Sequence, residues 1–207
     1  MLDRRDFMQG AAITTATAAT GLSVGAARAA TMSFHKVIFD EDFDQSRLFG
    51  AAAQRLGAKV YSIRGDVTKL WYDHLYHRWR RSPAAIAGMT QHASLFVLEM
   101  MAADAGLRVI HRTHHQILSD GSMVHEAFGP AAHLRRTWFT ESPSTLWQSA
   151  WACRAAQIIM SWPADAARIS KAHSNIIEAR LRAVAPNTLI SWIIAPVERG
   201  PDVFERA

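Results

Sequence analysis

Cysteine is nearly absent from this sequence. Cys153 is the only cysteine in 207 residues, so the chain forms no internal disulfide, even in an oxidising compartment. A single thiol also excludes zinc sites built from several cysteines and the Cys-x-x-Cys-His motif of covalently attached haem. The fold must therefore depend on its hydrophobic core, for which an apolar content of 49% is ordinary.

The common catalytic motifs are missing as well. The sequence has no Gly-x-Gly-x-x-Gly after its first expected strand, no His-Glu-x-x-His and no Gly-x-Ser-x-Gly. These absences exclude the usual dinucleotide fingerprint, the zinc-protease helix and the serine-hydrolase elbow. The residues therefore indicate no particular reaction, and we expect the chain to hold no cofactor of its own.

Long apolar runs and basic tracts are absent beyond residue 29. No later stretch reaches 18 uninterrupted apolar residues, so we expect no membrane span once residues 1–29 are removed. The formal net charge of +5 is modest and comes from no basic tract. Nothing in it indicates a nucleic-acid partner.

The amino-terminal segment has the three parts of an export signal. Arg4, Arg5 and Phe7 resemble the twin-arginine consensus, an uncharged stretch covers 10–27, and Ala27-Arg28-Ala29 closes it with small residues around a cleavage position. The segment therefore predicts export by the twin-arginine route to the periplasm. That route carries folded proteins, which typically hold a cofactor or travel with a partner that holds one.

This interpretation divides the chain in two. Residues 1–29 are expected to be the signal peptide, and residues 30–207 form one domain by the usual size of domains. The question for the rest of the sequence is whether this domain holds a cofactor itself or binds a partner that does.

Hydrophobic periodicity in the first half predicts an α/β fold. Apolar strands are expected at 34–40, 59–64 and 84–89, and helices at 45–56 and 91–105. Gly57 and Gly106 end the two helices. Strand–helix–strand units of this length place their strands in parallel.

The second half adds an antiparallel hairpin. Asp120-Gly121 separates extended runs at 107–118 and 123–128, which is a hairpin signal. The remaining segments are, in order, a helix from 142 to 162, a helix from 164 to 185, a strand buried on both faces at 188–195 and a loose tail from about 196. Together these segments predict a three-layer α/β domain whose sheet is mostly parallel with one antiparallel hairpin strand.

Polar residues follow the expected parallel strands at their carboxyl ends. In open α/β sheets, ligands bind beyond these ends. The candidate catalytic residues there are Asp40, Arg64, Asp66, Thr90 and His92. Carboxylates, an arginine and a histidine in one crevice suit acid–base chemistry or anion binding, although polar residues also end strands without any function.

Histidines are concentrated around the hairpin. His111 and His115 share one face of their strand, because side chains alternate, and His125 should lie opposite His114 to Gln116. His111, His115 and His125 are therefore a candidate site for a first-row metal. The alternative is a hydrogen-bonded polar face of the sheet.

An aromatic segment follows the second strand. It contains Trp71, Tyr72, Tyr76, Trp79 and Arg80, residue types that are enriched at protein interfaces. We therefore consider it a candidate partner surface. The alternatives are a cover over the sheet edge and one wall of a ligand pocket.

Three stretches of the chain resemble small exported proteins associated with flavin alcohol dehydrogenases of the glucose-methanol-choline type. These stretches are 36–40, 63–71 (Ile-Arg-Gly-Asp-Val-Thr-Lys-Leu-Trp) and 83–96 (Pro-Ala-Ala-Ile-Ala-Gly-Met-Thr-Gln-His-Ala-Ser-Leu-Phe). The resemblance implies an accessory subunit or maturation partner of a larger oxidoreductase, with FAD in the partner. It assigns no functional residue. A stand-alone periplasmic enzyme, with or without a metal, and a small-anion binding module are the alternatives.

Overall fold

The computed structural model describes residues 30–117, 123–134, 147–167 and 188–197. Its elements, in chain order, are β1 (Lys36–Asp40), α1 (Asp44–Arg55), β2 (Val60–Ile63), α2 (Thr68–Leu70), η1 (Trp71–Leu75), α3 (Tyr76–Arg81), β3 (Ile86–Thr90), α4 (His92–Asp104), β4 (Leu107–Ile117), β5 (Met123–Phe128), α5 (Ala131–Leu134), α6 (Trp147–Met160), η3 (Ala164–Ala167) and β6 (Leu189–Pro196).

The six described strands form one mixed sheet in the order β2-β1-β3-β6-β4-β5. β1 pairs in parallel with β2 and β3, whereas β6 is antiparallel to both β3 and β4, and β5 is antiparallel to β4. β1 to β4 therefore all run in one direction. The predicted α/β class is confirmed. In addition to the expected hairpin strand β5, the sheet contains a second antiparallel strand, β6.

β6 occupies the middle of the sheet between β3 and β4. The helix α4 connects β3 to β4, as the sequence predicted, but β6, the last of the described strands, is inserted between them. Seven of the eight residues of β6 are buried, so both of its faces must be covered. A central position provides that cover, because a strand there has neighbours on both sides and a helical layer on both faces.

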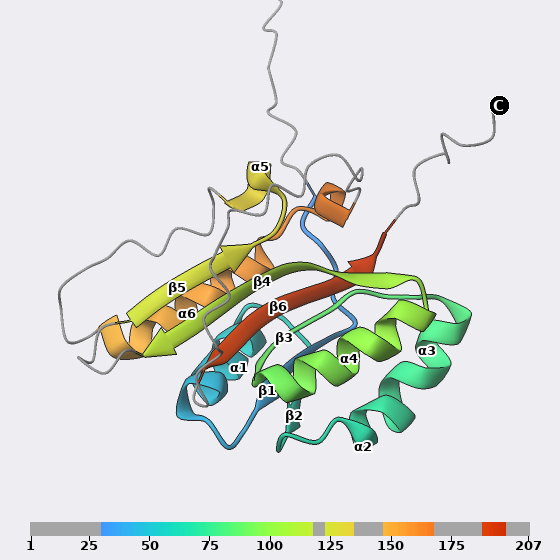
Figure 1. The fold of residues 1–207 in the computed structure, drawn as a ribbon, viewed down its shortest axis with the longest axis horizontal. Helices are drawn as coiled ribbons and strands as arrows, with labels where there is room; N and C mark the ends of the chain where they lie inside the picture. The colour runs from blue at the N-terminus through green and yellow to red at the C-terminus, as the bar shows by residue number, and fades with distance from the viewer. Residues whose placement is uncertain (1–29, 118–122, 135–146, 168–187, 198–207) are drawn as a thin grey trace, which may run out of the picture.

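Helices cover both faces of the sheet (Figure 1). Alternating residues of β1 point to opposite sides, so Val37 belongs to the core under α1 and α6 while Ile38 belongs to the core under α2, α3 and α4. The fold therefore has three layers with two hydrophobic cores.

Glycines end two helices, as the sequence predicted. Gly57 follows α1 with φ 90°, and Gly106 follows α4 with φ 75°. Only glycine adopts this left-handed conformation without strain, and it turns the chain out of the helix toward the next strand.

Several sequence predictions lie outside the described residues. They are the signal residues Arg4, Arg5 and Phe7, the Asp120-Gly121 turn, most of the helix predicted at 164–185, and the tail beyond residue 197. Within the described ranges, no helix is long and apolar enough to cross a membrane.

Candidate functional site

The carboxyl ends of β1 and β3 form the point where the chain connectivity reverses direction. From β1 the chain passes through α1 to β2 on one side of β1, and β3 lies on the other side. Open α/β sheets bind ligands at such a switch point, in the crevice beyond the strand ends. Asp40, the last residue of β1, lies there.

Asp40 is almost completely buried. Only 1% of its surface is exposed, and Oδ1 accepts a hydrogen bond of 3.2 Å from the backbone N–H of Asp42. Within the described part of the chain, Oδ2 has no hydrogen-bond partner. Burial raises the pKa of the Asp40 carboxyl, and the negative charges of Asp42 and Glu41 add to this effect, whereas the hydrogen bond from the Asp42 N–H opposes it.

A buried serine fixes the backbone of Asp40. Ser46 Oγ accepts a hydrogen bond of 2.8 Å from the Asp40 N–H and donates one of 2.6 Å to the carbonyl of Met89. This hydroxyl, in the first turns of α1, thus joins the ends of β1 and β3. Ser94, near the start of α4, donates a hydrogen bond of 2.7 Å from its Oγ to the carbonyl of Gly65, and so joins α4 to the loop after β2.

Sequence analysis missed both serines. The only signal for them was their position, because each lies shortly after a strand at the start of the following helix.

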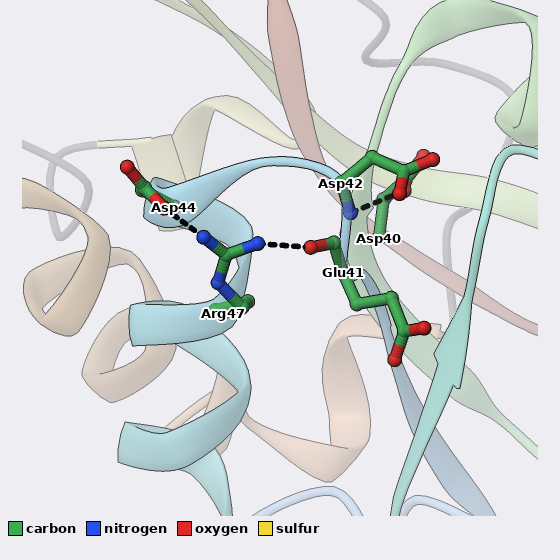
Figure 2. Close-up of polar contacts among 5 residues, drawn as sticks. All are labelled: Asp40, Glu41, Asp42, Asp44 and Arg47. Carbon is green, nitrogen blue, oxygen red and sulfur yellow. Dashed lines mark hydrogen bonds and ion pairs between the residues drawn. The ribbon is translucent and has the colours of Figure 1, made fainter.

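Only some carboxylates of the acidic run after β1 have an arginine partner among the described residues, and Figure 2 shows Arg47 with Asp44 and the backbone of Glu41. Arg47 pairs with Asp44 and also donates to the backbone carbonyl of Glu41, and the Glu41 carboxylate pairs with Arg64. The hydrogen bond from Arg64 lowers the pKa of Glu41. Among the described residues, no such arginine partner is found for Asp40 or Asp42.

The other predicted strand-end residues have local structural contacts. Asp66 Oδ1 accepts a hydrogen bond from the Thr68 N–H at 2.8 Å, which stabilises the start of α2. Thr90 ends β3, and its Oγ1 accepts a hydrogen bond from Trp192 Nε1 at 3.0 Å. His92 stacks on Phe96 with ring centroids 6.3 Å apart. The structure therefore gathers Asp40, with Glu41 and Arg64, at the strand ends.

Two of the three candidate metal-binding histidines are in contact. His115 and His125 are register partners on β4 and β5, with their Nδ1 atoms 2.7 Å apart. His115 Nε2 also lies 2.9 Å from Ser191 Oγ, and its ring packs on Trp151 with centroids 4.5 Å apart. The predicted pairing of the hairpin is thus confirmed.

His111 makes separate contacts farther along the same face. Its Nε2 lies 3.1 Å from Thr113 Oγ1, and its ring packs on Trp162 with centroids 4.3 Å apart. Burial lowers the pKa of His111 to about 3 and that of His125 to about 4, and it holds the pKa of His115 well below its ordinary value. The described ranges contain no group of three side chains placed to bind one metal ion.

The aromatic segment is partly a core element. Trp79 is only 2% exposed, and its Nε1 donates to the Ala84 carbonyl at 3.0 Å. Trp71 packs edge-on against Tyr76 and Trp79, with centroids 5.6 and 5.9 Å away. Tyr72 is 64% exposed, and Arg80 is exposed and donates to the Tyr76 hydroxyl at 2.5 Å. Of the predicted partner residues, Trp79 therefore points inward and Tyr72 and Arg80 reach the surface.

An apolar surface that sequence analysis missed lies on α4. Phe96, Val97 and Met100 are 52%, 37% and 57% exposed, and Phe96 and Met100 are one turn apart. The opposite side of α4 buries Leu95, Leu98 and Ala102 in the core. The broad apolar character of this helix was visible in the sequence, but periodicity could not show which apolar residues remain outside.

A groove opens at the opposite end of the strands from Asp40, near the amino ends of β1 and β3. His35, Lys59 and Arg78 contribute basic groups to its lining, which includes no acidic side chain from the described residues. Burial lowers the pKa of His35, assisted by the charge of Arg78. Such a groove would suit an anionic ligand, as the small-anion alternative requires.

Comparison with known proteins assigns no relative to this chain. No protein-family model matches it, and no match was found among the curated proteins or the solved structures.

Proposed function

We propose that this chain is an exported, non-catalytic accessory subunit that binds a larger oxidoreductase through the outer face of α4. The observation that carries the proposal is the exposure of Phe96, Val97 and Met100 on one side of this helix. The flavin alcohol dehydrogenase as partner is inferred from the resemblance of 36–40, 63–71 and 83–96.

The composition of α4 supports an interface. A helix that lies on the surface of a sheet normally turns polar residues outward, whereas α4 has large apolar residues on both its inner and its outer side. Phe96 and Met100 are already about half buried, so burying the rest of each side chain against a partner would contribute about 0.8–1.5 kcal/mol, half of the value for complete burial. Exposed apolar residues clustered in this way commonly mark a binding surface.

Basic residues of α3 bear on the charge of the partner. Arg80 and Arg81 are exposed and lie on α3, which covers the same face of the sheet as α4 (Figure 1). A partner surface with an apolar centre and an acidic rim would complement this arrangement. In this proposal the exposed side chains of Tyr72 and Arg80 would belong to the rim of the interface.

Co-purification tests the proposal. The chain, tagged at its carboxyl terminus and exported in a native-like host, should elute from the periplasm with a stoichiometric, yellow, flavin-containing polypeptide. The double variant Phe96→Asp and Met100→Asp should lose that polypeptide, because buried charges would oppose docking.

Val124→Asp provides the matched control. Val124 is also an exposed apolar residue, but it lies on β5, away from α4, so this variant should retain the partner. A single chain without a second polypeptide, or retention of the partner by the α4 double variant, would contradict the proposal.

A further inference from the structure

We propose that Asp40 and Asp42 bind a hard divalent cation, Mg²⁺, at the carboxyl end of β1. This site is independent of the proposed interface on α4 and would be present whether or not a partner binds there. The inference rests on the burial of Asp40, on the distribution of arginines around it, and on its position in the sheet.

The first argument is the state of the Asp40 carboxyl group. It is 1% exposed, and Oδ2 has no hydrogen-bond partner within the described residues. An ionised carboxylate buried without a compensating charge is strongly unfavourable, and buried charges are normally paired or coordinate metals. A cation on the side of Oδ2 would supply the missing partner.

The second argument is the distribution of charge around Asp40. Glu41 and Asp44 pair with Arg64 and Arg47, whereas no arginine pair is found for Asp40 or Asp42 among the described residues, although the charge of Asp42 also acts on Arg64. The carboxylates of Asp40 and Asp42 point to the side away from Arg47 (Figure 2), and the negative charge of Asp42 is close enough to raise the pKa of Asp40. Two carboxylates that repel each other there would be held together by a divalent cation.

The ligand set selects the kind of cation. The described residues contain no group of three histidine, cysteine or acidic side chains placed to hold a metal ion, so a cation here would have only the two carboxylates as side-chain ligands. Mg²⁺ is commonly bound by one or two carboxylates and keeps several waters. Asp42 is exposed, so the remaining coordination positions are open to water or to an oxygen of an anionic ligand.

The position of the site provides the third argument. Asp40 ends β1 beside β3, at the switch point where α/β sheets bind ligands. Ser46 Oγ bonds both the Asp40 N–H and the Met89 carbonyl, so the backbone under the carboxylate is fixed before any ion arrives. A fixed ligand loses little conformational entropy on binding.

Thermal unfolding with and without MgCl₂, at constant ionic strength and pH 7.5, tests the site. At an Mg²⁺ concentration about a hundred times the dissociation constant, the melting temperature of the wild-type chain should rise by about 5–10 °C. Asp40→Asn and Asp42→Asn should each abolish this rise. Asp44→Asn is the matched control, because Asp44 belongs to the same acidic run but pairs with Arg47, and it should retain the rise.

Two further results keep the test decisive. Without Mg²⁺, Asp40→Asn should fold and be at least as stable as the wild type, because it removes a buried charge. If Asp40→Asn does not fold, Asp42→Asn decides, because Asp42 is exposed and its replacement should leave the fold intact. The proposal is overturned if Mg²⁺ leaves the melting temperature of the wild type unchanged, or if Ca²⁺ raises it and Mg²⁺ does not. It is also overturned if Asp42→Asn keeps the Mg²⁺-dependent rise or if Asp44→Asn loses it.

Discussion

At the scale of single residues, the buried histidines make stability depend on pH. Burial lowers the pKa of His111 from 6.5 to about 3 in the folded state. Above pH 6.5 the imidazole is neutral in both states, so its effect on stability is constant. As the pH falls below 6.5, the unfolded chain binds a proton that the folded chain does not, and stability decreases until the pH reaches the folded pKa.

This argument predicts the behaviour of His111→Leu. The wild type should lose about 2 kcal/mol of unfolding free energy through His111 alone between pH 7 and pH 5. Between the same two pH values, the loss of unfolding free energy in the Leu variant should be smaller than that of the wild type by this amount. Urea unfolding of both proteins at pH 7 and pH 5 would measure the difference. An unchanged pH dependence would show that His111 is already accessible to protons in the folded protein.

At the scale of elements, the hydroxyl of Ser46 joins β1 to β3. Ser46→Ala would leave the Asp40 N–H and the Met89 carbonyl buried without this partner. The expected loss is about 1–3 kcal/mol in the free energy of unfolding, measured by chemical denaturation. Ser62→Ala, at an exposed position on β2, is the control and should change stability by less than about 0.5 kcal/mol. Equal effects of the two variants would contradict the structural role of Ser46.

Sequence patterns predicted most elements but not their neighbours. The apolar run of β6 indicated burial on both faces, which the structure confirms. Its insertion between β3 and β4 depends on pairing with strands that lie about a hundred residues earlier in the chain, such as Trp192 with Gly88. No local pattern encodes such a pairing. Asp40 was likewise identifiable as a strand-end residue, whereas the hydrogen bond from Ser46 to the carbonyl of Met89, 43 residues away, was not.

At the scale of the whole molecule, the residues after the expected cleavage position belong to the fold. Ala30 accepts a hydrogen bond of 2.8 Å from the Ala164 N–H, and the Met32 N–H donates one of 2.7 Å to the Trp162 carbonyl. Loss of these residues would expose backbone groups near the end of α6. A mature chain that begins at residue 30 would keep both bonds.

Export provides the corresponding prediction. The periplasmic form should begin at Ala30 in amino-terminal sequencing. Replacing Arg4 and Arg5 by lysine should leave the protein in the cytoplasm with its signal attached, whereas Asp6→Asn, a neighbouring change outside the arginine pair, should leave export intact. Export of the double lysine variant at the wild-type level would exclude the twin-arginine route.

The sequence by itself determined the fold class, the main strands and helices of the first half, and the antiparallel pairing that puts His125 opposite the range from His114 to Gln116, because these follow from local periodicity and turn chemistry. Only the tertiary structure decided which apolar residues of α4 remain exposed and that Trp79 is buried. It also decided that, among the residues that the structure describes, the arginines pair with Glu41 and Asp44 and not with Asp40 or Asp42. Burial and charge pairing depend on segments that meet only when the sheet assembles, so no single stretch of sequence contains them.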